Sequence, residues 1–283
     1  MNERFAAFSF VDRISRRTLQ HIEGQYTVPA HATRFPASLM AEAVGQLAAW
    51  SAMSSHDFSL RPVAGLAART RYLQAACPGQ TLTLEAEIVR CDAEAIAYGG
   101  RASIGGRCAL ELDDCLGPML PMEEFDEAQA VRRDFEMLCG PGAAAGRFGG
   151  VPVPDLEPTE HLPGRRLVAT LRVPGRDEAP FFGDHFPRRA VYPGTLLLDA
   201  LGRLAVTVAD EARAERGAGE WVPRIVTDVK IRTFTPPGAR LDLSAELIDV
   251  DTHCARLKLA ARGDGRSVAS AKIEVGAAPE VTT

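Results

Sequence analysis

The sequence predicts an α+β protein in which one structural unit occurs twice, each unit being an antiparallel sheet wrapped around a central helix. Three observations predict this fold class. Two stretches repeat in the same order at nearly one offset, each copy contains a long apolar segment, and the segments after it alternate apolar and polar residues. A helix that is apolar on nearly all sides is buried, and alternation with a period of two is typical of half-buried strands.

The repeat is clearest in the two apolar segments and in the strands that follow them. Residues 35–48 (FPASLMAEAVGQLA) match residues 192–205 (YPGTLLLDALGRLA) at an offset of 157. Residues 78–89 (PGQTLTLEAEIV) match residues 237–248 (PGARLDLSAELI) at an offset of 159. Two matches in the same order predict two copies of one unit.

The remaining elements follow from local patterns. The helices are expected at about 36–53 and 193–212. Residues 97–112 and 255–275 predict hairpins, because glycine-containing turns interrupt alternating apolar residues. Residues 120–138 predict a short surface helix that closes the first copy.

These elements divide the chain into three parts. We expect an N-terminal lobe at 1–138 and a C-terminal lobe at 161–283. Residues 139–160 are rich in Gly, Ala and Pro, which is typical of a linker.

Composition argues against several classes of function. The net charge of −5 is unlike the basic balance of most nucleic-acid-binding proteins. No apolar run approaches the roughly 18 residues of a membrane span, and the first residues do not resemble a secretory signal. The six cysteines are scattered without a CxxC pair, so we expect no zinc site and the reduced thiols of a cytoplasmic protein.

The stretch FFGDHFPRRAVYPGTLLLDA, residues 181–200, combines the groups needed to move protons next to a carbonyl. It contains a histidine on a loop, His185, a glycine that opens a helix, Gly194, and a helix acid, Asp199. The stretch resembles the signature of the bacterial 3-hydroxyacyl-ACP dehydratases of the hot-dog fold, and two copies resemble a double hot-dog. It departs from the signature at Asp184, where a glycine or small residue is usual, and at Ala190, where proline is usual.

The first copy lacks the segment that carries this histidine. Residues 28–29 and 173–174, which follow matching strands, are 145 apart, whereas the helices are 157 apart. The first copy is therefore 12 residues shorter between strand and helix. It keeps a helix acid, Glu42, at the place of Asp199 in the second copy.

In the dehydratase family, an active site lies between two units and combines the histidine of one with the helix acid of the other. The resemblance thus implies one active site per chain, formed by His185 and Glu42. Asp199 would face a degenerate site near His31, although the sequence leaves open which of the two acids works. Gln46, one turn after Glu42, could orient its carboxyl or simply fill space.

The resemblance implies dehydration of a 3-hydroxyacyl thioester without a cofactor or a metal. His185 would remove the C2 proton, and Glu42 would protonate the departing hydroxyl, because a carboxyl among apolar side chains can hold a proton. The backbone N–H of Gly194 would stabilise the developing oxyanion. The resemblance implies that this reaction is a step of fatty-acid or polyketide-type biosynthesis.

Other residues near the motif have two interpretations each. Four aromatic residues could line an acyl tunnel or belong to the core: Phe181, Phe182, Phe186 and Tyr192. Arg188 and Arg189 could dock an acidic acyl carrier protein or form a solvated charge pair. Two chains could also associate as a homodimer of double hot-dogs.

Two alternative functions remain at this point. The first is a hot-dog thioesterase or acyltransferase, although these enzymes generally lack the histidine loop. The second is a non-catalytic subunit that binds an acyl carrier protein, because the first copy is degenerate.

Overall fold

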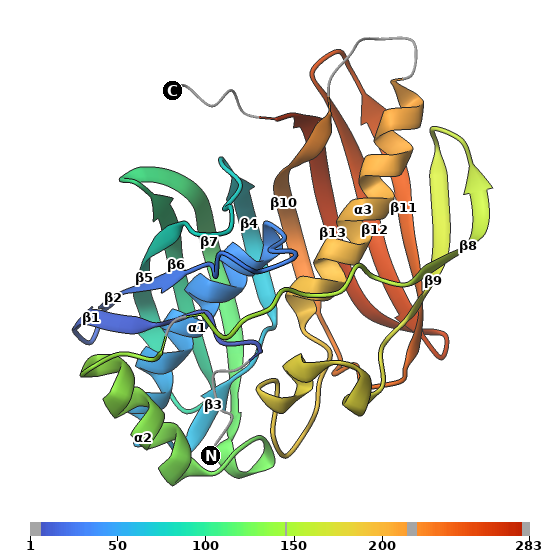
Figure 1. Ribbon diagram of the computed structural model, residues 1–283. Coiled ribbons are helices and arrows are strands. Elements are labelled where there is room, and N and C mark those ends of the chain that lie inside the picture. Colours follow the sequence, from blue (N-terminus) through green and yellow to red (C-terminus); the bar gives the residue numbers. More distant parts are fainter. Residues whose placement is uncertain (1–6, 145, 214–219, 279–283) are drawn as a thin grey trace.

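The computed structural model describes residues 7–144, 146–213 and 220–278, and they form two lobes of the same topology (Figure 1). The elements of the N-terminal lobe are β1 (Arg13–Arg17), β2 (His21–Thr27), α1 (Ser38–Ser55), β3 (Leu60–Pro62), β4 (Leu66–Tyr72), β5 (Thr81–Cys91), β6 (Ala95–Ile104), β7 (Arg107–Pro121), η1 (Met122–Glu124) and α2 (Ala128–Cys139). Those of the C-terminal lobe are β8 (Leu156–Leu162), β9 (Arg166–Arg172), η2 (Arg176–Glu178), η3 (Pro180–Gly183), α3 (Gly194–Ala212), β10 (Trp221–Ile231), β11 (Arg240–Val250), β12 (Cys254–Gly263) and β13 (Arg266–Ala277).

Within the described residues, all strands belong to one 13-stranded antiparallel sheet. Its order is β1-β2-β5-β6-β7-β4-β10-β13-β12-β11-β9-β8, with β3 paired to β7. The order reads as the same six-strand sequence from either end, so β4 of one lobe meets β10 of the other at a pseudo-twofold axis. This junction joins the two lobes through backbone hydrogen bonds.

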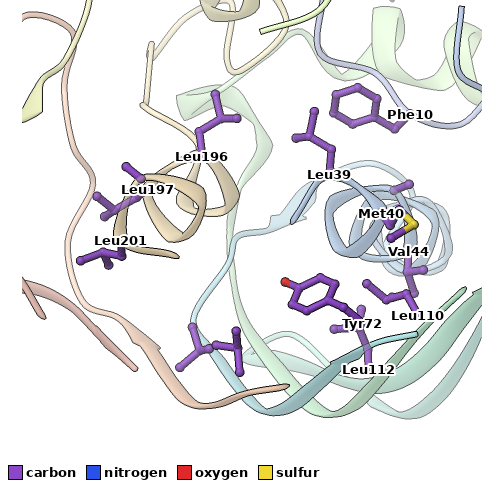
Figure 2. Close-up of a cluster of buried hydrophobic side chains, with 14 of the residues drawn as sticks. Phe10, Leu39, Met40, Val44, Tyr72, Leu110, Leu112, Leu196, Leu197 and Leu201 are labelled. Carbon is purple, nitrogen blue, oxygen red and sulfur yellow. The ribbon is translucent and has the colours of Figure 1, made fainter. Parts of the chain in front are cut away.

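The two long helices lie on the same face of the sheet, one in each lobe (Figure 1). Leu39, Met40 and Val44 of α1 are fully buried, and Leu201 of α3 is equally buried. Figure 2 shows these side chains around the helices, with Tyr72 of β4 beneath α1. Burial of each large aliphatic side chain contributes roughly 1.5–3 kcal/mol, so the sheet holds both helices mainly by apolar contact.

The predicted helices and hairpins are present. α1 and α3 begin within two residues of the expected positions. Gly105 and Gly106 turn the β6–β7 hairpin at φ +57° and +79°, and Asp264 and Gly265 turn the β12–β13 hairpin at φ +49° and +74°. Positive φ at both positions is the geometry of a two-residue turn that matches strand twist.

The helix predicted within 120–138 corresponds to α2. Glu127 caps its N-terminus by accepting hydrogen bonds from the backbone N–H groups of Gln129 and Ala130. Val131 packs against Phe58, so α2 closes one end of the N-terminal lobe. The sequence signal that places it is the acidic cap before an apolar stripe.

The expected linker needs correction at its C-terminal end. Strand β8 begins at Leu156, inside the range 139–160, and pairs with β9. Its residues are exposed except for the partly buried Leu156, so the alternation that reveals half-buried strands is absent. Pro158 and the charges of Glu157 and Glu160 suit an edge strand that must not pair further.

None of the helices in the described ranges has the length and the apolar character required to cross a bilayer.

Candidate active site between the lobes

The loop that carries His185 reaches from the C-terminal lobe to the N-terminal lobe. It connects β9, which ends at Arg172, to α3, and it contains η2 and η3. Its far end contacts the other lobe, where the Arg188 backbone N–H donates to the Phe125 carbonyl at 3.0 Å. The Phe186 ring meets the Phe125 ring edge-on at 5.2 Å. The extra length of the second copy is therefore used to cross the seam.

A cavity of about 240 Å³ lies at this seam. Residues of both lobes line it, among them the predicted site residues Glu42, Gln46, His185, Phe186, Tyr192 and Gly194. From there it continues between α1 and the strands of the N-terminal lobe, past Ala49 and Met53 to the side of Leu112. Most of the surface beyond the acid is apolar, which suits a hydrocarbon chain.

The His185 ring is held in one orientation. Its Nδ1 lies 2.7 Å from the Val191 carbonyl oxygen. Because a carbonyl oxygen only accepts, Nδ1 carries the proton, and Nε2 of the neutral ring has a free lone pair. The Phe186 ring stacks on the imidazole at 4.1 Å, and the Phe8 ring meets it edge-on at 5.4 Å.

Burial lowers the pKa of His185, because the charged imidazolium loses its hydration. The negative charge of Glu42 acts in the opposite direction and raises the pKa, while the positive charge of Arg61 lowers it. The balance favours the neutral ring, which is the form able to accept a proton. His185 and Glu42 both line the cavity.

Neutral donors from both lobes hold the Glu42 carboxyl. Thr195, the second residue of α3, donates from Oγ1 to Glu42 Oε2 at 2.7 Å. Gln46 donates from Nε2 to Glu42 Oε1 at 3.1 Å. Gln46 thus takes the orienting place suggested by the one-turn spacing, whereas the contact with Thr195 comes from tertiary structure alone.

Gly194 begins α3, after Pro193 at the N-cap position. The N–H groups of the first helical turn have no partner within a helix, and they carry the positive end of its dipole. A Cβ on Gly194 would meet only Ile231 at an ordinary 3.5 Å, so packing within the protein does not require glycine here. The open space belongs to the cavity.

Asp199 lies away from this cavity, although it is the counterpart of Glu42 in the repeat. Arg34, from the short loop of the first copy, forms an ion pair with it, and both side chains are largely buried. The charge of Asp199 also contributes, after burial, to raising the pKa values of Tyr72 and Tyr192. In this half of the seam, the helix acid is therefore paired with a cation from the shorter loop.

The other predicted residues separate into two groups. Phe181 and Phe182 are buried in the core and do not line the cavity, whereas Phe186 and Tyr192 do. Arg188 and Arg189 are exposed, and both contact η1 of the other lobe. Arg188 donates to the Glu123 carbonyl at 3.1 Å, and Arg189 forms an ion pair with Glu124 at 2.6 Å.

Tyr98 and Cys115 are functional candidates that the sequence did not reveal. They face each other across β6 and β7, are hydrogen-bonded, and line the cavity near Glu42. In the C-terminal lobe the corresponding pair in the β12–β13 register is Leu257 and Ile273, both buried. Comparison of the two copies strand by strand would have shown that the polar pair occurs only beside the cavity.

Within residues 7–144, 146–213 and 220–278, no group of three or more His, Cys, Asp or Glu side chains could hold a metal ion. All six cysteines are free thiols.

Residues 164–272 match the family described as the FabA-like domain. A 3-hydroxyacyl-[acyl-carrier-protein] dehydratase FabZ from Thioalkalivibrio sulfidiphilus (strain HL-EbGR7) is 34% identical over 120 residues, which cover 41% of this chain and 79% of the relative. The dehydratase of that name from Anaeromyxobacter sp. (strain Fw109-5) is 36% identical over 115 residues, 38% of this chain and 70% of the relative.

Solved structures extend the similarity in fold to both lobes. A MaoC-like dehydratase aligns with a TM-score of 0.53 at 12% identity, over 92% of this chain and 98% of that one. The structure titled oleoyl thioesterase (putative) from Lactobacillus plantarum aligns with a TM-score of 0.57 at 10% identity, over 92% of this chain and 96% of that one. The fold is a double hot-dog, and the chain belongs to the FabA-like family of hot-dog dehydratases.

Proposed function

We propose that the protein converts a 3-hydroxyacyl thioester into a 2-enoyl thioester by removing water. The observation that carries this proposal is that His185 and Glu42, from different lobes, line one cavity beside the N-terminus of α3. A base, an acid and an unpaired backbone N–H are the groups that the reaction needs.

In the proposed mechanism, Nε2 of His185 removes the proton from C2, and the electron pair of that bond forms the C2–C3 double bond. The C3–O bond breaks, and Glu42 donates a proton so that the hydroxyl leaves as water. The N–H of Gly194 stabilises the negative charge that develops on the thioester oxygen. Transfer of a proton from His185 to Glu42, directly or through solvent, restores both groups.

We further propose that the acyl chain arrives on an acyl carrier protein, as the names of the relatives state for those proteins. The apolar cavity suits the chain, and Arg188 and Arg189 beside the loop suit an acidic partner. A place in fatty-acid or polyketide-type biosynthesis, a cytoplasmic location and association of two chains belong to the same proposal.

The test is incubation with a 3-hydroxyacyl acyl carrier protein and with a short pantetheine thioester. Appearance of the 2-enoyl thioester, and the reverse hydration, are the expected results. Release of free thiol without an enoyl product would instead identify a thioesterase. Binding of the acylated carrier without turnover would identify a non-catalytic subunit. The His185→Ala variant is the control for non-enzymatic reaction.

A further inference from the structure

Asp184, the residue before the histidine, makes a contact that the family signature does not anticipate. Its Oδ2 accepts hydrogen bonds from the backbone N–H groups of Ala7 and Phe8, both at 2.8 Å. A glycine, which is usual at this position of the signature, has no side chain to accept them. The contact joins the histidine loop of the C-terminal lobe to the N-terminal segment 7–10, which we call the strap.

The strap also contacts the side chain that holds the acid. The Phe8 carbonyl accepts a hydrogen bond from Gln46 Nε2 at 3.1 Å, and the Phe10 N–H donates to Gln46 Oε1 at 2.8 Å. Both ends of the Gln46 amide are thereby fixed. Its Nε2 is the atom that donates to Glu42 Oε1.

The same strap covers the base. The Phe8 side chain is 2% exposed and meets the His185 ring edge-on. Phe10 anchors the other end of the strap in a buried aromatic cluster, with Tyr26 at 5.3 Å and Phe148 at 5.2 Å. Phe8 thus lies between two attachments, the aromatic cluster and the carboxylate of Asp184.

We propose that Asp184 is a positioning residue for the reaction, because it holds the strap that aligns Gln46 with Glu42 and shields His185 from water. The expected effect on kcat rests on the proposed dehydratase function. The structural consequence, attachment of the strap, does not depend on that function.

The test compares Asp184→Gly with Asp184→Asn. The asparagine carboxamide oxygen can accept both N–H groups without the charge, so Asp184→Asn should retain the strap. We expect Asp184→Gly to lower kcat by about tenfold to a hundredfold with little change in KM, because small misplacement of reacting groups has effects of that order. Asp184→Asn should restore kcat to within about threefold of the wild type. Asp177→Ala, an exposed change in the same loop, is the control.

Two measurements need no enzymatic activity. Hydrogen exchange at the amides of Ala7 and Phe8 should become faster in Asp184→Gly and stay slow in Asp184→Asn. An NMR titration of His185 should move its pKa upward in Asp184→Gly as water reaches the ring, with Glu42 of α1 and Arg61 of β3 still facing it. Loss of the negative charge of Asp184 alone would move the pKa of His185 downward. The Asp184→Asn variant measures that effect separately, because it removes the charge and keeps the strap attached.

The proposal is overturned if Asp184→Gly keeps the wild-type kcat and slow exchange, or if Asp184→Asn is as impaired as Asp184→Gly. If Asp184→Gly does not fold, Phe8→Ala tests the same strap through the His185 titration, where an unchanged pKa would overturn it. If the exchange and titration shift as expected but neither the wild type nor any variant dehydrates a thioester, attachment of the strap by Asp184 stands and the dehydratase proposal fails.

Discussion

Glu42 and Asp199 occupy the same place in the two copies, yet their surroundings give them different chemistry. Glu42 receives hydrogen bonds from the neutral donors Thr195 and Gln46 and faces the cavity. Asp199 is paired with Arg34 and is not among the residues that line the cavity. Of these two acids, Glu42 is the one placed to contact a ligand in the cavity.

We expect Glu42→Gln to lower kcat by about 10²- to 10⁴-fold, the usual contribution of a general acid. Asp199→Asn should keep kcat/KM within about threefold of the wild type, but lower the free energy of unfolding by roughly 3 kcal/mol because Arg34 loses its partner. Turnover assays and denaturant unfolding of both variants measure this. Loss of turnover only in Asp199→Asn would reverse the assignment.

The lowered pKa of His185 predicts the pH dependence of turnover. A base works when neutral, so on the acidic side activity should fall as the pH drops through a value below the ordinary 6.5 of histidine. Arg61 is one cause of the lowering, so Arg61→Gln should move the acidic limb of kcat/KM to higher pH. A limb that stays in place or moves to lower pH would contradict this account of the base.

At the scale of elements, contact between α1 and its sheet depends on close approach at β6. A Cβ on Gly100 would clash with the Glu85 carbonyl oxygen and would lie 2.6 Å from Cγ1 of Val44 in α1. The corresponding position in the C-terminal lobe holds the buried Leu259, so the two helices do not lie on identical surfaces.

Gly100→Ala should therefore destabilise the protein by about 1–3 kcal/mol, because strand and helix must both move to admit the methyl group. Gly149→Ala is the matched control, since a Cβ there meets nothing within 4 Å. Chemical denaturation measures both. Equal stabilities of the two variants would show that the sheet yields more easily than the contacts indicate.

Local patterns accounted for much at this scale. The apolar runs of α1 and α3 and the Gly105-Gly106 turn are encoded within a few neighbouring residues, so the sequence predicted them. Strand β8 escaped prediction because an exposed edge strand has no buried face to produce alternation.

At the scale of the whole molecule, one sheet with pseudo-twofold order carries two unequal halves. The histidine loop crosses the seam in one direction only, and Arg34 pairs with Asp199 in the other half. Leu257 and Ile273 are buried where Tyr98 and Cys115 line the cavity. The two halves therefore share one backbone arrangement but differ in the side chains along the seam.

This asymmetry predicts one ligand per chain. Titration calorimetry with a non-hydrolysable 3-hydroxyacyl amide analogue of the pantetheine thioester, in which nitrogen replaces the sulfur, should give a stoichiometry of one, and Asp199→Asn should not change it. The reason is that the cavity lies beside Glu42 and is lined by His185, whereas the matching acid, Asp199, is paired with Arg34. A stoichiometry of two would mean that the degenerate half still binds the acyl group.

The sequence by itself determined the doubled unit, the two central helices, the histidine loop and the absence of its counterpart in the first copy. These features are written in residues that lie close together along the chain, or in its similarity to itself. Only the tertiary structure decided that Thr195 and Gln46 donate hydrogen bonds to Glu42. It also decided that Arg34 pairs with Asp199 and that Asp184 accepts hydrogen bonds from the N-terminal strap. Most of these contacts join segments that are far apart in the chain and lie on opposite sides of the seam. Such partners depend on how the two lobes pack together, and a local sequence pattern does not contain that information.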